Sequence, residues 1–462
     1  MRHTLALVRA RALVRPDDIA LMMPDRAVTY AMLASGIASV ASWCHANLDP
    51  SFPLVAVSSG SPIRATILSL GLFEAGFTSL AAAPRLLEKA AALGAHALFC
   101  DTGAHPPDGM RGIVADERIF SFAPGTTAPA EWHARRVARV EFTSGSTGEK
   151  KAIGLTADAI DCQTRNRVTA YGLGEPRALC LFPVSANVGF GFVLAMLALG
   201  RTTAFGASND EFVHLLRQFS ITAMLGSPAQ VATLIRRHEE LQIAPSTLRQ
   251  VILAGSMVSR GFLADVRQAF GAETVIDYGS TETGPVALAS DRLVHDDDYR
   301  VVPHQEMKVE APEGAPGPLR VRSSGMGLPF AGNLVQDAAD TAEYWFRPGD
   351  VGVANEDGSV SVLGREDFLI NIGGTKIAPE RIEARLARTF GLDRVCAVAL
   401  PGSADLQILH DGQIDIAADR ISQGLSDLLP SMARVRCVRV ASFPMTVTGK
   451  IDRQALVSLV RS

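Results

Sequence analysis

The segment EFTSGSTGEKKA, residues 141–152, decides how the rest of the chain is interpreted. It continues the segment VARVEF, residues 137–142, whose alternating apolar residues predict a strand. Small hydroxyl residues, glycines and lysines then follow within residues 143–151. Glycines allow the backbone to turn, amides and hydroxyls donate hydrogen bonds, and ammonium groups neutralise phosphate charge. The segment therefore predicts a strand that runs into an anion-binding turn.

This turn does not match the Walker phosphate loop. That motif needs a glycine, four residues, and then Gly-Lys followed by Ser or Thr. Here Gly145 is followed by Gly148, and Lys150 by Lys151, so the spacing fails. On these residues alone, a flexible surface turn rich in serine and glycine stays an open alternative.

Composition limits the classes of protein. A chain of 462 residues predicts two to four folding units, and 47% hydrophobic with 20% charged residues is typical of a soluble globular protein. A net charge of −4 argues against a dedicated nucleic-acid binder. No segment is apolar for long enough to span a bilayer. The six cysteines form no CxxC pair, which favours buried thiols in a reducing compartment and predicts a cytoplasmic protein.

The N-terminal segment MRHTLALVRARALVRPDD faintly resembles a transit peptide, but it is poor in serine and we interpret it as an amphipathic surface helix. Further along, helical and strand patterns alternate, which predicts parallel sheets covered by helices. Residues 105–135 are expected to form loop, and near residue 300 the pattern changes to short strands with turns. Asp357-Gly358 marks a hairpin there.

The predicted fold class is therefore α/β. We expect a large N-terminal domain of two doubly wound α/β subdomains plus a small β-rich subdomain, followed by a small mobile α+β C-terminal domain. In that C-terminal domain, helices are expected over residues 379–390 and 419–429, with strands over 394–400 and 435–442.

A second motif, DYGSTETG at residues 277–284, follows the apolar strand ETVI. Thr281 and Glu282 then lie at the C-terminal end of a strand, the edge where open α/β sheets bind ligands. Beside a phosphate-binding loop, the Glu282 carboxylate is a reasonable magnesium ligand, because divalent hard ions prefer oxygen donors. Tyr278 could offer a flat face to a base. A tight turn with a solvated glutamate is the alternative.

Together with TSGSTGEKK, this motif resembles the adenylate-forming superfamily. Its members include acyl-CoA synthetases, carrier-protein ligases, peptide-synthetase adenylation domains and luciferases. The resemblance continues through WFRPGDVG at 345–352, GREDFLINIGGTKIAPERIE at 364–383 and FPMTVTGKIDR at 443–453. These motifs stand in the family's order and cover nearly the whole chain.

The resemblance implies a site for ATP. Its phosphates would be bound by Thr143, Ser144, Gly145, Ser146, Thr147, Gly148 and Lys151. Its adenine would be held by Gly255, Ser256, Met257, Asp277, Tyr278 and Gly279. By the same resemblance, Thr281 contacts the α-phosphate and Glu282 binds Mg²⁺. Asp350 would accept both ribose hydroxyls, which suits a carboxylate with two acceptor oxygens, and Arg365 would brace the ribose or phosphate.

The same resemblance places the catalytic cation far along the chain. Lys450 corresponds to the lysine that contacts the substrate carboxylate and the α-phosphate, where two anions must approach each other. Asp367 corresponds to the pivot of a hinge, and Gly373-Gly374 to the face offered to a thiol. The implied domains are residues 1–364, a hinge at 365–367, and residues 368–462 carrying the lysine.

The segment FPVSANVGFGF departs from the family pattern. Ala186 stands where a histidine is frequent, and no aspartate lies between Phe182 and Phe192, which argues against an amino-acid substrate. Asn187 aligns with an asparagine that aryl-acid-activating members direct at a ring hydroxyl; a loop asparagine capping its own backbone is the alternative. The substrate pocket is expected to include Ala186, Asn187, Gly189 and Phe190.

The sequence therefore predicts an ATP- and Mg²⁺-dependent ligase that activates an aryl or medium-sized carboxylic acid as acyl-AMP. The acceptor is expected to be CoA or the phosphopantetheine of an acyl carrier protein. An amino-acid adenylating enzyme and a degenerate nucleotide- or acid-binding protein stay open as alternatives. Neither a nucleic-acid partner nor a membrane span is expected.

Overall fold

The structure analysed is a computed structural model. It describes residues 1–103, 105–121, 123, 131–132, 136–143, 150–172, 177–241, 247–258, 260–290, 298–302, 305–331, 334–335, 344–372, 375–377, 379–390, 392, 395–399, 405–411, 417–426, 429, 434–444, 451, 453 and 455–456. Its helices are α1 (Arg2–Val14), α2 (Tyr30–Asn47), α3 (Pro62–Glu74), α4 (Leu87–Ala92), α5 (Glu117–Phe120), α6 (Ala157–Tyr171), α7 (Asn187–Ala198), α8 (Asn209–Gln218), α9 (Pro228–Glu240), α10 (Arg260–Phe270), α11 (Pro379–Phe390) and α12 (Ala418–Gly424).

The larger sheet has a parallel centre and antiparallel flanks. In sheet order, its strands are β16 (Gln305–Val309), β17 (Gly317–Ser323), β20 (Asp350–Ala354), β21 (Val360–Arg365), β15 (Asp298–Val301), β14 (Gly284–Ser290), β13 (Glu273–Ser280), β12 (Gln250–Ala254), β11 (Ala223–Gly226), β9 (Arg177–Cys180), β10 (Thr202–Ala204), β1 (Ile19–Met23) and β2 (Arg26–Thr29). Strands β1 and β9 to β13 pair in parallel, as the alternating helices and strands predict.

The second sheet carries the strand that leads into the predicted phosphate loop. In sheet order, its strands are β19 (Leu334–Val335), β18 (Leu328–Ala331), β8 (Ala152–Thr156), β7 (Val137–Phe142), β4 (Thr78–Ala81), β3 (Leu54–Ser58), β5 (Ala97–Cys100) and β6 (Arg111–Val114). Helices α6 and α7 pack against each other, and one core cluster joins the two sheets through α7. It contains Leu21 of the first sheet, Val55 of the second and Phe192 of α7.

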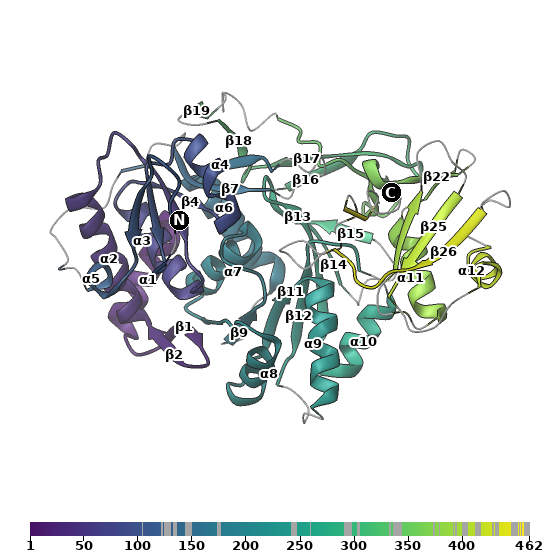
Figure 1. Ribbon diagram of the computed structural model, residues 1–462, viewed down its shortest axis with the longest axis horizontal. Helices are drawn as coiled ribbons and strands as arrows, with labels where there is room; N and C mark the ends of the chain where they lie inside the picture. Colours follow the sequence, from purple (N-terminus) through teal and green to yellow (C-terminus); the bar gives the residue numbers. More distant parts are fainter. Residues whose placement is uncertain are drawn as a thin grey trace.

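The remaining strands lie near the C-terminus. They form a pair, β22 (Ile370–Ile372) with β23 (Thr375–Ile377), and a sheet of β24 (Val395–Ala399), β25 (Asp405–His410) and β26 (Arg434–Arg439). Figure 1 shows α11, α12, β25 and β26 at one end of the molecule and α1 and α2 at the other. Within the residues covered by the structure, no helix is long and apolar enough to cross a membrane.

The α/β class is confirmed, with four differences in detail. Residues 105–135 are not all loop, because β6 and α5 lie within them. The β-rich segment is not a separate sheet: β15, β16, β17, β20 and β21 extend the larger sheet, while β18 pairs with β8. The N-terminal strands β1 and β2 also join the larger sheet, so the two sheets do not correspond to consecutive segments. Helix α1 is packed as well as amphipathic, since Leu5 and Val8 are buried.

Candidate active site

The predicted phosphate loop connects two antiparallel strands. Phe142 of β7 pairs with Ala152 of β8, and the Thr143 amide donates to the Lys151 carbonyl at 2.9 Å. Residues 143 and 151 therefore lie side by side at the loop end of this hairpin. Ser144, Gly145, Ser146, Thr147 and Gly148 lie outside the described residues, so their phosphate contacts stay predictions.

The turn between β13 and β14 carries Thr281 and Glu282. Thr283 closes this turn, because its Oγ1 lies 3.1 Å from Ser280 Oγ and 3.2 Å from the Ser280 amide. The neighbouring segment fixes it from outside, where the Gly327 amide donates to the Glu282 carbonyl at 2.6 Å. A Cβ at Gly279 would meet the Gly284 carbonyl oxygen at 2.2 Å, so only glycine allows the two strand ends to approach this closely.

The donor set at this turn fits a magnesium ion that arrives with a nucleotide. Within the described part of the chain, no group of three or more His, Cys, Asp or Glu residues could hold a metal by itself. Magnesium is usually bound by one or two carboxylates together with substrate phosphates and water. Glu282, half-buried at the turn, is a single carboxylate of that kind.

Three predicted nucleotide-binding side chains meet on one face of the larger sheet. Tyr278 Oη donates to Asp350 Oδ2 at 2.6 Å, and Arg365 Nε lies 3.7 Å from Asp350 Oδ1. Burial, reinforced by the charge of Asp350, raises the pKa of Tyr278 well above its ordinary value, so the phenol is a proton donor. Asp350 Oδ2 thus accepts a hydrogen bond from Tyr278. Each carboxylate oxygen can accept more than one hydrogen bond, so this contact is compatible with the expected binding of the ribose hydroxyls.

Asp277 lies on the opposite face of β13 from Tyr278, because successive side chains in a strand alternate. Its Oδ2 accepts a 2.7 Å hydrogen bond from Tyr171 Oη of α6, and burial raises the pKa of its carboxyl. The two side chains therefore cannot line one base-binding surface together. Gly255, Ser256 and Met257 follow β12 at the same sheet edge, where Ala254 pairs with Asp277.

The residues predicted to line the substrate pocket lie in the first turn of α7 and at its N-cap. Ala186 is its N-cap residue and Asn187 its first residue, so Asn187 is not a loop residue capping its own backbone. Asn187 Nδ2 donates to the Thr281 carbonyl at 3.0 Å, which brings this turn to the 281–283 turn. A Cβ at Gly189 would lie 2.4 Å from the Pro183 carbonyl oxygen, so glycine is required for this close approach.

Sequence reasoning missed an ion pair beside the first turn of α7. Arg139 and Glu141 of β7 are both 1% exposed and lie 2.6 Å apart. The Arg139 guanidinium stacks on Phe190 at 3.8 Å and donates to the Val184 carbonyl at 2.8 Å. Glu141 accepts from the backbone amide of Asn187; burial nevertheless raises the pKa of its carboxyl. The two opposite charges two residues apart within the apolar segment VARVEF were the sequence signal that could have predicted this buried ion pair.

The roles of the remaining predicted residues stay predictions. Gly373, Gly374 and Lys450 lie outside the described residues. Asp367 is exposed, and its Oδ2 lies 3.9 Å from Arg365 Nη2, directly after the strand that carries Arg365. Its role as a pivot stays a prediction.

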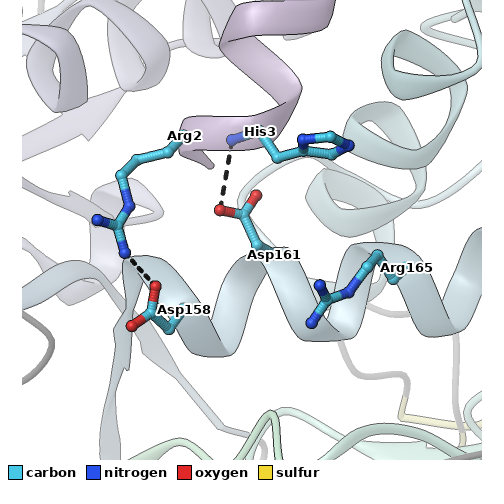
Figure 2. A pocket seen from close by; sticks show the side chains of 5 residues that line it. All are labelled: Arg2, His3, Asp158, Asp161 and Arg165. Carbon is cyan, nitrogen blue, oxygen red and sulfur yellow. Dashed lines mark hydrogen bonds and ion pairs between the residues drawn. The ribbon is translucent and has the colours of Figure 1, made fainter.

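A surface pocket between α1 and α6 does not belong to this site (Figure 2). Arg2, His3, Asp158, Asp161 and Arg165 line it, with Arg2 bonded to Asp158 and the His3 amide 3.4 Å from Asp161. At 3.6 residues per turn, the α6 members of this pocket point away from the face that carries Gln163, Arg167 and Tyr171. The helix thus separates the pocket from the candidate active site.

The chain is similar to known proteins over most of its length. A family model described as AMP-binding enzyme matches residues 8–328. The chain is 27% identical to phenyloxazoline synthase MbtB of Mycobacterium sp. (strain MCS) over 79% of its own length and 34% of that protein. It therefore spans about a third of that relative. It is 26% identical to a 4-chlorobenzoate–CoA ligase of Arthrobacter sp over 87% of this chain and 83% of the relative.

A solved structure shows the same fold. The anthranilate CoA ligase AuaEII in complex with anthranoyl-AMP matches with a TM-score of 0.86 at 19% identity, covering 99% of this chain and 97% of that one.

Proposed function

Because the chain belongs to the family of AMP-binding enzymes, we propose that it activates a carboxylic acid with ATP and passes the acyl group to a thiol. One observation carries this proposal: Asn187 contacts Glu141, two residues before the phosphate loop, and also Thr281 of the β13–β14 turn. Two phosphate-binding segments from different sheets thus lie within reach of one residue, which contacts Glu141 through its backbone amide and Thr281 through its side chain. Such convergence suits a single nucleotide spanning both.

The proposed reaction has two steps. A carboxylate oxygen of the acid attacks the α-phosphorus of ATP, the bond from this phosphorus to the bridging oxygen breaks, and pyrophosphate leaves. A thiol sulfur then attacks the acyl carbonyl, its proton is lost, and AMP leaves with the bonding electron pair. Mg²⁺, held by Glu282 and the phosphates, would neutralise charge on the nucleotide.

Different residues of this chain have different roles in the proposed reaction. Thr281 donates toward the α-phosphate, and Asp350, braced by Tyr278 and Arg365, receives the ribose. Lys450 places a cation between the carboxylate and the α-phosphate, where two anions meet. We propose that residues 368–462 bring Lys450 to the site and then rotate about Asp367, which offers Gly373-Gly374 to the thiol.

An aromatic acid is the preferred substrate class. The named relatives and the solved neighbour include ligases of 4-chlorobenzoate and anthranilate, which supports this preference. CoA and a carrier-protein phosphopantetheine are both proposed as acceptors of the acyl group. A cytoplasmic location is also proposed, because the cysteine pattern favours a reducing compartment. An amino-acid substrate is the second candidate, but the absent aspartate between residues 182 and 192 argues against it.

The test is pyrophosphate release from MgATP over a panel of benzoates, fatty acids and amino acids, with no thiol present. We expect release with at least one aromatic acid, followed by acyl transfer when CoA or a loaded carrier protein is added. No release with any acid, combined with measurable ATP binding, would instead support a binding protein that has lost catalysis.

A further inference from the structure

We propose that Asn187 is a positioning residue that holds the Thr281 turn relative to the phosphate loop, and that its side-chain amide does not donate to the acid. This inference rests on the proposed acid activation. It leaves the side-chain oxygen as the only part of the Asn187 amide that can meet a ring hydroxyl, the contact that the resemblance suggested.

Both hydrogens of the Asn187 amide are already engaged. Nδ2 donates to Gln163 Oε1 at 2.9 Å and to the Thr281 carbonyl at 3.0 Å. A primary amide nitrogen carries two hydrogens. Asn187 is 7% exposed, so a substrate could not take one of these hydrogens without breaking a buried hydrogen bond.

The orientation of the amide follows from its partners. Gln163 Nε2 donates to the Gly325 carbonyl at 2.8 Å, which leaves Gln163 Oε1 as the acceptor that faces Asn187. The other partner, the Thr281 carbonyl, can only accept. Because both groups are acceptors, the nitrogen of Asn187 must face them, and the flipped amide would set oxygen against oxygen.

The backbone of Asn187 is held from the opposite side. Its amide donates to the Glu141 carboxylate, which is itself 2.6 Å from Arg139. The N-cap residue Ala186 makes no side-chain cap, so a carboxylate from β7 replaces the usual capping group at the positive end of α7. The strand before the phosphate loop therefore fixes where α7 begins.

The turn is also fixed at its far edge. Ser323 Oγ donates to the Thr283 carbonyl at 3.1 Å, and the Gly327 amide donates to the Glu282 carbonyl at 2.6 Å. With Gln163 bonded to Gly325, the segment 323–327 and Asn187 hold the turn from two sides. We call Glu141, Asn187, Gln163 and Thr281 the Asn187 relay. These contacts set the distance between the phosphate loop and the Thr281 turn, the two segments that must bind one nucleotide.

The decisive variant is Asn187→Ala, with Asn166→Ala as the matched control. Asn166 is a buried asparagine on α6, 5% exposed, whose amide lies 3.9 Å from Cys162 Sγ within its own helix. If Asn187 positions the turn, kcat for pyrophosphate release falls roughly 10- to 100-fold, because small misplacements of catalytic groups have large effects on rate. The KM for the acid stays near the wild-type value, and Asn166→Ala changes kcat little.

Acids with and without a ring hydroxyl separate the two roles. A positioning residue gives the same fold-loss in kcat for both members of a matched pair, such as benzoate and 2-hydroxybenzoate. Asn187→Asp should lose more than Asn187→Ala, because its carboxylate faces the Thr281 carbonyl and Gln163 Oε1. A loss confined to the hydroxylated acid, with a raised KM for that acid, would overturn the inference.

A second measurement does not depend on catalysis. Amide hydrogen exchange in the ligand-free protein should accelerate at residues 280–284 and at Gly327 in Asn187→Ala, and stay as in wild type in Asn166→Ala. Unchanged exchange there would overturn the relay even if the enzyme is active. Conversely, if none of the tested acids supports pyrophosphate release by the wild-type protein, the proposed function fails. Accelerated exchange in Asn187→Ala would still support the relay.

Discussion

Replacing Arg139 by methionine should strongly destabilise the protein, because it leaves the Glu141 carboxylate buried without its cation. Both side chains are 1% exposed and their charged atoms lie 2.6 Å apart. Breaking a buried ion pair from one side costs about 3–5 kcal/mol of unfolding free energy. Urea unfolding followed by tryptophan fluorescence measures the loss. The double variant Arg139→Met/Glu141→Leu should recover part of it, because no unpaired charge remains.

The pH dependence of this loss has a defined sign. Burial raises the pKa of Glu141, while Arg139 acts in the opposite direction, so removing Arg139 raises that pKa further. A carboxyl whose pKa is higher in the folded state than in the unfolded state binds protons preferentially when folded. The variant should therefore gain stability relative to wild type as the pH falls from about 8 toward the unfolded glutamate pKa of about 4.3.

The control is Arg237→Met, which removes two exposed ion pairs, with Asp210 and Glu240. Arg237 lies 2.6 Å from Asp210, whose side chain is 68% exposed, and such pairs contribute about 0–1 kcal/mol. If Arg139→Met loses no more stability than Arg237→Met, or if its loss is equal at both ends of the pH range, the buried pair does not act as argued.

Three further predictions concern the site and the hinge. Tyr278→Phe removes the 2.6 Å hydrogen bond to Asp350 and should raise the KM for ATP by a factor of about 5, corresponding to a hydrogen bond of about 1 kcal/mol; an unchanged KM would contradict the contact. Gly191→Ala places a Cβ 2.3 Å from the buried Arg167 guanidinium and should lower unfolding stability by about 1–3 kcal/mol in urea, unlike Gly424→Ala, whose Cβ would make only an ordinary contact, 3.6 Å from the Phe390 ring. Asp367→Pro should slow either adenylation or thiol transfer far more than the other in single-turnover assays; equal losses would argue against a pivot.

Local sequence patterns were sufficient for most elements near the site. The segment ETVI, predicted to be a strand, lies in β13. Asp357-Gly358 closes the hairpin between β20 and β21, with Gly358 at a φ of 78°, the left-handed region that favours glycine. The hairpin depends on contacts between residues close in sequence.

What the sequence could not predict depends on contacts between distant segments. Strand β25 was missed although Leu406, Ile408 and Leu409 are buried, because a run covered on both faces lacks the polar alternation of a half-buried strand. The strand order that joins β1 and β2 to the larger sheet leaves no local signal. The same is true of the Asn187 relay, whose members lie on β7, α6, α7 and the β13–β14 turn.

The central claim is that this chain forms an acyl-adenylate. Mass spectrometry of a reaction of the chain with MgATP and an aromatic acid that supports turnover, with no thiol added, tests it most directly. The account predicts an enzyme-bound species with the mass of acid plus AMP minus water, together with pyrophosphate, and neither product from Lys450→Ala with an intact circular dichroism spectrum. Formation of ADP and phosphate instead, or equal yields of the adenylate from wild type and Lys450→Ala, would contradict it.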